Sequence, residues 1–401
     1  LLQGDVGSGK TVVAACAILD ALECGVQAAV MAPTEILAVQ HARTLGRYLQ
    51  PMGIRISVLT SSLDARDKIS ARAAMADGRT QLVIGTHALI QERVVFKDLG
   101  LVIIDEQHKF GVEQRGLLYG KGATPDVLVM TATPIPRTLA MTLYGDLDVT
   151  TIRELPRGRQ DIVTRVIGEA QLDKAYGFIR DQVAKGRQAF LVYPLVEESE
   201  QLEAKAATEM FAQLQQHQFS GLALGLLHGQ MDAEAKETTM ENFRRGDLNI
   251  LVATSVVEVG VDVPNASVML VENAERFGLA QLHQLRGRIG RGEHRSYCIL
   301  QGLPTSREAW QRLKVMERTR DGFVIAEEDF RIRGMGNLLG REQSGALVLR
   351  AGDPLRDQAL LEQARAEAFR LIDADPRLEA PEHAALRHRA RALHRSASSR
   401  C

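Results

Sequence analysis

Short apolar runs alternate with amphipathic stretches along most of the chain, and this alternation constrains the fold more than any other feature of the sequence. Five runs in the first part have the length and composition of buried parallel strands, at residues 26–31, 54–59, 81–85, 101–104 and 127–130. Helical patterns lie between them, as at residues 11–22 and 36–49. Alternating strands and helices of this length predict a parallel sheet with helices on both faces.

The alternation stops at residues 154–159, Glu-Leu-Pro-Arg-Gly-Arg, and then starts again. A break that contains Pro and Gly indicates an interdomain linker. Further strands are predicted at residues 189–192, 222–227, 250–252, 268–271 and 297–300, and further helices at 172–183, 201–216 and 233–243. We therefore predict two similar α/β lobes in series, residues 1–154 and residues 155–303, each built on a parallel sheet.

The strand signal ends near residue 302, so residues 304–401 are predicted to form a C-terminal helical region. One helix is expected at 307–317, and the Gly-rich residues 334–337 have the composition of a flexible loop. The basic, Ser-containing segment 387–400 is expected to be a frayed and solvated tail rather than a DNA-binding arm.

Bulk composition narrows the class of protein. The formal net charge is −1, so any nucleic-acid binding must rely on local positive charge. The cysteines Cys16, Cys24, Cys298 and Cys401 form no C-x-x-C pair, which predicts reduced thiols without a metal or disulfide framework. No apolar run approaches the ~18 residues of a membrane span. We expect a cytoplasmic protein without membrane contact.

The start of the chain carries a nucleotide-binding pattern. Residues 4–11, Gly-Asp-Val-Gly-Ser-Gly-Lys-Thr, fit the phosphate-loop pattern G-x-x-x-x-G-K-[ST] between the end of a strand and the start of a helix. Glycines let the backbone approach phosphates closely, and the following helix N-terminus supplies positive potential. We expect Lys10 to reach the β- and γ-phosphates of ATP and the Thr11 hydroxyl to ligate Mg²⁺. The predicted nucleotide-binding residues here are Gly4, Asp5, Val6, Gly7, Ser8, Gly9, Lys10 and Thr11.

Two carboxylates follow the apolar strand at residues 101–104. A strand that ends in Asp105 and Glu106 delivers both to the carboxyl edge of the sheet, where open α/β sheets bind ligands. Asp105 is expected to hold Mg²⁺ through water, and Glu106 to polarise the attacking water. The next strand ends in Thr131-Ala132-Thr133, whose hydroxyls are predicted to couple the carboxylates to the second lobe.

The second lobe carries a cluster of arginines and glycines at residues 284–291, Gln-Leu-Arg-Gly-Arg-Ile-Gly-Arg. Arg288 and Arg291 are three residues apart, so on a helix they would share one face. From there they are predicted to stabilise transition-state charge at a γ-phosphate held by the other lobe, as an arginine finger does. Gln284, the first residue of the same block, is also predicted to be catalytic. Gly260 and Asp262, after another strand, are predicted to reach the nucleotide.

Nucleic-acid contacts are expected from loops at the same sheet edges, including Thr34, Thr86 and the segment at His228. Small and hydroxyl residues contact phosphates without reading bases. The sequence has no run of aromatic residues that would stack bases, which favours tracking of the backbone.

The long motifs together resemble the RecG family of bacterial ATP-dependent DNA helicases, in superfamily 2. The resemblance rests on residues 4–11, on Asp105-Glu106-Gln107-His108, on residues 130–137 and 193–200, and on the arginine block. It implies RecA-like lobes and an ATP-driven motor that acts on branched DNA, at forks and Holliday junctions, in recombination and repair. His108, Thr131 and Thr133 are then coupling residues. A helical hairpin and loop would couple ATP turnover to movement on duplex DNA through Arg312, Arg333 and Gln343.

Two alternatives remain open at this point. The motor of the transcription-repair coupling factor shares the block after the second lobe, although Gln107 and residues 194–200 favour RecG. A fragment that binds DNA without unwinding it is the other, because the chain opens at Leu1 without an initiator Met. We expect an N-terminal truncation that removes a wedge domain and an adenine-contacting segment.

Overall fold

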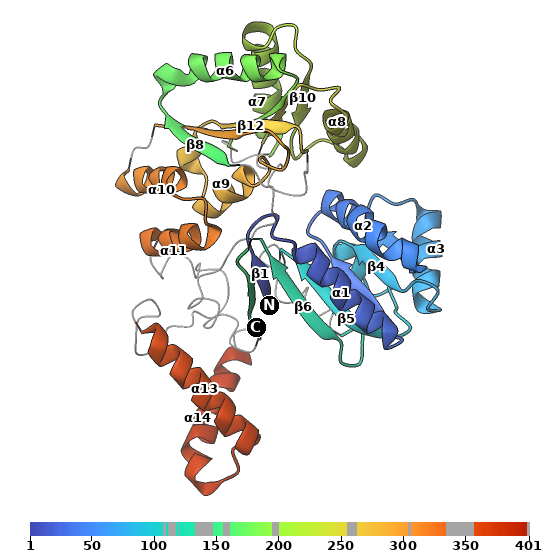
Figure 1. The fold of residues 1–401 in the computed structure, drawn as a ribbon. Helices are drawn as coiled ribbons and strands as arrows, with labels where there is room; N and C mark the ends of the chain where they lie inside the picture. The colour runs from blue at the N-terminus through green and yellow to red at the C-terminus, as the bar shows by residue number, and fades with distance from the viewer. Residues whose placement is uncertain are drawn as a thin grey trace. The chain divides into compact units, whose positions relative to one another are not determined.

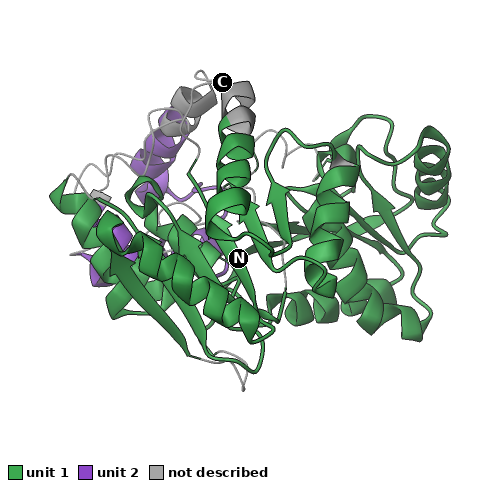
Figure 2. Ribbon diagram, turned by 90° about the horizontal axis from the view of Figure 1, so that it is seen from above, with its two compact units in different colours: residues 1–134, 150–325 green, residues 135–149, 326–401 purple. Residues whose placement is uncertain are grey.

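The fold was obtained as a computed structural model, which describes residues 1–106, 110, 118, 120–132, 147–154, 161–194, 200–254, 263–303, 306–333 and 357–398. The chain divides into two compact units, coloured separately in Figure 2. One unit contains Leu1–Pro134 and Thr150–Ile325, and the other contains Ile135–Val149 and Ala326–Cys401. Both sheets lie in the first unit (Figure 1).

The first sheet is parallel throughout the part of the chain that the structure describes, in the order β3-β4-β2-β5-β6-β1-β7. Its strands are β1 (Leu2–Gly4), β2 (Gln27–Met31), β3 (Ile56–Leu59), β4 (Leu82–Gly85), β5 (Leu99–Asp105), β6 (Asp126–Thr131) and β7 (Thr150–Ile152). The helices of this lobe are α1 (Lys10–Glu23), α2 (Glu35–Leu49) and α3 (Ala65–Ala76). Because all these strands run the same way, their carboxyl ends form one edge.

Successive residues of β2 face opposite cores, as strand geometry requires. Ala28 and Val30 pack in one apolar cluster with residues of α1 and α2, such as Ile18 and Leu45. Residues from the other face of the sheet form a second cluster, which includes Met31 and the α3 residue Met75. Burial on both faces explains why the strands read as continuous apolar runs.

The second sheet repeats the strand order of the first. Its order is β10-β11-β9-β12-β13-β8, again parallel over the described residues. The strands are β8 (Ile162–Ile167), β9 (Gln188–Val192), β10 (Leu224–Leu227), β11 (Ile250–Ala253), β12 (Ala266–Val271) and β13 (Ser296–Gln301). Helices of this lobe are α6 (Leu172–Ala184), α7 (Glu200–Gln213), α8 (Ala233–Arg245) and α9 (Leu279–Arg286). Numbered from its own first strand, each lobe has the order 3-4-2-5-6-1, and the first lobe adds β7 beside β1.

A buried glutamine begins the second strand of each lobe and serves the same purpose in both. The Gln27 side-chain nitrogen donates to the carbonyls of Met75 and Thr80, at 3.0 and 2.6 Å. The Gln188 side-chain nitrogen donates to the carbonyls of Phe243 and Leu248, at 2.5 and 2.7 Å. Each glutamine thus ties a strand to the end of a helix and satisfies buried carbonyls.

Four helices follow the second sheet: α10 (Arg307–Arg318), α11 (Gly322–Arg333), α13 (Gln358–Ala374) and α14 (Ala384–Ser398), counted over the residues the structure describes. The predicted α/β class with two parallel-sheet lobes and C-terminal helices is confirmed. The frayed tail expected at residues 387–400 is wrong over most of its length, because α14 extends to Ser398. Its Ala, Leu and Arg residues are strong helix formers. The predicted linker at 154–159, apart from residue 154, and the Gly-rich loop at 334–337 lie outside the described residues.

No helix among the described residues is both long enough and apolar enough to cross a membrane.

A buried carboxyl group directly follows β12. Glu272 accepts hydrogen bonds from the phenol groups of Tyr176, at 2.5 Å, and Tyr193, at 2.8 Å. Burial raises the pKa of Glu272, against the lowering effect of the two phenols. The folded protein therefore favours the neutral carboxyl more than the unfolded chain does. The contribution of Glu272 to stability is lost as pH rises above the ordinary pKa of 4.5.

Glu272→Gln keeps the oxygen acceptor for both phenols and removes the charge, so we expect no loss of stability at pH 8. Glu272→Ala leaves two buried hydroxyls without their acceptor and should lower the free energy of unfolding by about 1–3 kcal/mol. Denaturant unfolding of both variants at pH 5 and pH 8 checks this. Equal destabilisation by the two substitutions would contradict the explanation.

Candidate functional site

The segment between β1 and α1 presents backbone N–H groups at the carboxyl edge of the first sheet. Gly7 and Gly9 have positive φ angles of 77° and 94°, which side chains disfavour. Gly9 precedes α1 without a side-chain cap, and the first turn of α1 has no acidic residue. An uncapped helix N-terminus next to a glycine-rich turn is an anion-binding arrangement. The geometry fits the predicted phosphate loop.

Lys10 lies inside this loop. Its ammonium group donates to the carbonyls of Gly4, at 2.7 Å, and Asp5, at 3.0 Å. Burial lowers the pKa of Lys10, although Asp105 and Glu106 oppose the shift. Lys10 therefore lies close to both predicted catalytic carboxylates, which come from a different strand.

Asp105 is the last residue of β5, and His41 on α2 holds its carboxylate. The distance from His41 Nε2 to Asp105 Oδ2 is 2.7 Å, and the other oxygen accepts from the Glu106 N–H at 3.1 Å. Burial alone would raise the pKa of Asp105, but the bond to His41 and the charge of Lys10 hold it below its ordinary value. Asp105 is thus fixed in position as an anion.

Glu106 has a backbone conformation that is rare outside glycine. Its φ is +52°, and its N–H donates to the carbonyl of Met130 on the neighbouring strand at 3.0 Å. Conformations of this kind concentrate at functional sites. Burial, with the charge of Asp105, raises the pKa of Glu106 to about 7. Two adjacent carboxyl groups therefore have well-separated pKa values.

The second lobe contributes two arginines to the same place. Arg291 helps to lower the pKa of Lys10, and Arg288 lowers that of Glu106, so both cations lie near the first-lobe residues. Arg291 Nε also donates to the carbonyl of Gly287 at 3.1 Å. The predicted helical face shared by Arg288 and Arg291 is wrong. Helix α9 ends at Arg286, and Gly290, with φ of +78°, lies in the turn that follows.

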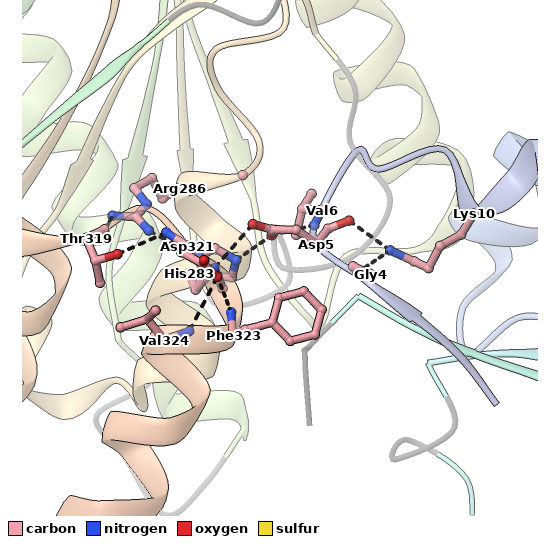
Figure 3. A network of polar contacts seen from close by, with 12 residues as sticks. Gly4, Asp5, Val6, Lys10, His283, Arg286, Thr319, Asp321, Phe323 and Val324 are labelled. Atoms are coloured by element: carbon pink, nitrogen blue, oxygen red, sulfur yellow. Dashed lines mark hydrogen bonds and ion pairs between the residues drawn. The ribbon is translucent and has the colours of Figure 1, made fainter. Parts of the chain in front are cut away.

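The two lobes touch directly at the phosphate loop. A Cβ atom added at Gly287 would lie 2.8 Å from Cβ of Val6, so only glycine permits this approach. His283 of α9 binds the carboxylate of Asp5 at 2.6 Å (Figure 3). Gln284 follows on α9 and is buried. The first-lobe loop and the second-lobe arginine block thus lie in contact.

Other predicted residues occupy varied positions. Thr34 caps α2 by accepting from the Leu37 N–H at 3.3 Å, while Thr86 and Thr131 are buried at the carboxyl ends of β4 and β6. Thr11 is half-buried in the first turn of α1.

Arg312 of α10 donates to the carbonyl of Glu275 at 3.1 Å. Arg333 ends α11. His108, Thr133, Gly260, Asp262 and Gln343 lie outside the described residues.

Two histidines of the site, His41 and His283, were not predicted from the sequence. Each binds a carboxylate far away in the chain, 64 and 278 residues distant. The available signals were a histidine on the helix after the second strand and one beside the arginine block. Neither signal says which carboxylate the histidine meets.

Sequence models of three families match successive parts of the chain. The DEAD/DEAH box helicase model matches residues 1–142, and the helicase conserved C-terminal domain model matches residues 170–293. The model of the C-terminal part of domain 3 of the ATP-dependent DNA helicase RecG matches residues 319–399.

Individual relatives agree over almost the whole chain. The ATP-dependent DNA helicase RecG of Synechocystis is 52% identical over 380 residues, which cover 95% of this chain and 46% of the relative. The RecG of Escherichia coli O157:H7 is 48% identical, over 94% of this chain and 55% of the relative. The chain belongs to the RecG family. It spans about half the length of the curated RecG relatives it matches.

Solved structures extend the comparison. A structure of RecG bound to a three-way DNA junction has a TM-score of 0.71 and 46% identity, over 90% of this chain and 47% of that one. Dbp5 of S. cerevisiae bound to RNA and ADP BeF3 has a TM-score of 0.59 at 16% identity, over 83% of this chain and 88% of that one. The second likeness shows the RecA-like helicase fold alone.

The close approach at Gly287 yields a test. Gly287 has φ of −65°, so alanine suits its backbone, and the collision with Val6 is the main cost of Gly287→Ala. Overpacking of this kind should displace the phosphate loop and lower the free energy of unfolding by about 1–3 kcal/mol. Gly177→Ala is the matched control, because the nearest atom to its new Cβ would be a flexible Arg180 nitrogen at 3.7 Å. Unchanged stability of Gly287→Ala in denaturant unfolding would contradict the contact.

Proposed function

We propose that the chain is the ATP-hydrolysing motor of a RecG-type DNA helicase that acts on branched DNA, at forks and Holliday junctions. The observation that carries the proposal is the meeting of unlike charges from two lobes. Arg291 of the second lobe lies near enough to Lys10 of the first to lower its pKa, and Arg288 does the same to Glu106. Asp105 acts on the pKa of both first-lobe groups. Membership of the RecG family supports DNA as the substrate.

The chain's own residues have separate roles in this proposal. The N–H groups of the phosphate loop and the Lys10 ammonium bind the β- and γ-phosphates of ATP. Glu106, with its raised pKa, accepts a proton from the attacking water. Arg291 and Arg288 stabilise the charge that develops on the γ-phosphate. Gln284, which is buried on α9, completes the proposed nucleotide contacts together with Gly260 and Asp262.

A magnesium ion fits the donors present. The Thr11 hydroxyl and the Asp105 carboxylate are hard oxygen ligands, and Asp105 is held as an anion by His41. Mg²⁺ held by these two residues would neutralise phosphate charge during transfer. His41 would fix the orientation of Asp105, as groups that bind a ligating side chain commonly do.

DNA would be held by sheet-edge residues and moved by the C-terminal helices. Thr34 lies at the carboxyl edge of the first sheet, with a hydroxyl suited to phosphate contact, whereas Thr86 at the same edge is buried. Thr131, Thr133 and His108 would link the nucleotide to the second lobe, and Arg312, Arg333 and Gln343 would transmit the change to the DNA. We further propose residues 1–154, 155–303 and 304–401 as the three functional parts. The intact protein would act as a monomer on cytoplasmic, nucleoid DNA in recombination and repair.

Stimulation by DNA tests this proposal. The intact protein should hydrolyse ATP at least about tenfold faster with a forked duplex than without DNA, because coupling makes turnover depend on the track. Lys10→Ala should abolish turnover in both conditions. If the protein binds the fork but its ATP hydrolysis is not stimulated, the result would instead support the alternative of a DNA-binding fragment without motor activity.

The arginine finger gives a second test. Arg291→Ala should lower kcat for ATP by about a hundredfold or more, because transition-state charge loses a cation, while KM changes by less than about threefold. Steady-state kinetics measure both. Arg180→Ala, an exposed arginine on α6 of the same lobe, is the control and should behave as wild type. Equal losses in binding and turnover would contradict the role.

A further inference from the structure

Asp5, inside the phosphate loop, has a carboxylate that contacts the second lobe and the helical region at once. Its Oδ1 atom lies 2.6 Å from Nε2 of His283 on α9. Its Oδ2 atom lies 3.4 Å from the N–H of Gly322, the first residue of α11. The same carboxylate accepts from its neighbour Val6 N at 2.6 Å. One side chain thus joins the phosphate loop to two later elements (Figure 3).

The bonds on either side of His283 fix the position of its proton. Arg286 Nη2 lies 3.1 Å from His283 Nδ1. A guanidinium group has only donors, so Nδ1 of His283 is the acceptor, and Nε2 carries the hydrogen that it donates to Asp5. The three side chains therefore form a directed series, from Arg286 through His283 to Asp5.

Arg286 connects this series to the turn between α10 and α11. It is 2% exposed, and Nη1 donates to the carbonyls of Met316 and Thr319, at 2.9 Å each. The Met316 carbonyl lies in the last turn of α10, and the Thr319 carbonyl directly follows that helix. Asp321 directly precedes α11 and accepts from the Phe323 N–H at 2.8 Å. Displacement of the turn must therefore move the guanidinium or break its bonds.

We propose that Asp5, His283 and Arg286 form a relay that couples the phosphate loop to the α10–α11 turn, with His283 as its central positioning residue. This inference rests on the proposed function, since the relay needs a motor to couple. A change in the phosphate loop moves the Asp5 carboxylate. The hydrogen bonds through His283 and Arg286 then transmit this movement to the α10–α11 turn, without relying on apolar packing. The relay therefore acts on DNA-stimulated turnover more than on ATP binding.

A passive brace between the lobes is the competing explanation. A second contact between lobes separates the two ideas, because Arg43 of α2 lies 3.7 Å from Glu237 and 3.8 Å from Glu241, both on α8. Those ion pairs are at least partly exposed, and they join α2 to α8 rather than the phosphate loop to the α10–α11 turn. If bracing alone matters, Arg43→Ala and His283→Ala should have similar effects.

The test uses the intact protein, with ATP hydrolysis measured with and without a forked duplex. His283→Ala should lower the DNA-stimulated kcat by about tenfold, with KM for ATP changed by less than about threefold. His283→Gln should recover little of the loss, because its side-chain N–H₂ stands in for Nε2–H toward Asp5 but leaves Arg286 without the Nδ1 acceptor, whereas a passive brace would be restored. Arg43→Ala should retain stimulation within about twofold of wild type.

His283→Asn guards against a failure of the alanine variant to fold. Its shorter amide can stand in for Nδ1 toward Arg286 but stops short of Asp5, so it should lose stimulation as His283→Gln does, because each variant breaks one end of the series. Wild-type stimulation in any of the His283 variants overturns the relay alone, and so does an equal loss in Arg43→Ala. Absence of stimulation in the wild type overturns the proposed function, and the relay falls with it.

Discussion

The burial of unlike charges at one edge of the first sheet is the constraint on which the site depends. A lone buried lysine or carboxylate is strongly destabilising, so Lys10, Asp105 and Glu106 must be buried together. Their proximity also separates the carboxyl pKa values, with Asp105 below its ordinary value and Glu106 near 7. Adjacent carboxyl groups with different pKa values can take different roles in one reaction.

The repeated strand order explains how a second lobe can complete such a site. Both sheets have the order 3-4-2-5-6-1 when each is numbered from its own first strand. Each lobe therefore presents loops at one carboxyl edge, but their chemistry differs. The first lobe supplies an anion cradle and carboxylates, while the second supplies arginines after α9. The glycine at position 287 then allows the two to meet at Val6.

Sequence reasoning located the central strands because they are buried on both faces and read as apolar runs. For β9, residues 189–192 were predicted and Gln188–Val192 form the strand. The short strand β7 and the largely exposed helix α3 carry weaker patterns and were missed. Motif spacing predicted Lys10, Asp105 and Glu106, but His41 and His283 act through contacts between distant parts of the chain. Local spacing also suggested a helix through Arg288 and Arg291. In the structure the helix ends at Arg286, and Gly287 and Gly290 lie in the turn that follows.

The central claim is that one nucleotide is held by residues of both lobes. A crystal structure of the intact protein with Mg²⁺ and a non-hydrolysable ATP analogue tests it most directly. The account predicts the γ-phosphate within hydrogen-bond distance of Lys10 of the first lobe and of Arg291 or Arg288 of the second. A γ-phosphate bound by the first lobe alone, with both arginines turned away toward solvent, would contradict the account.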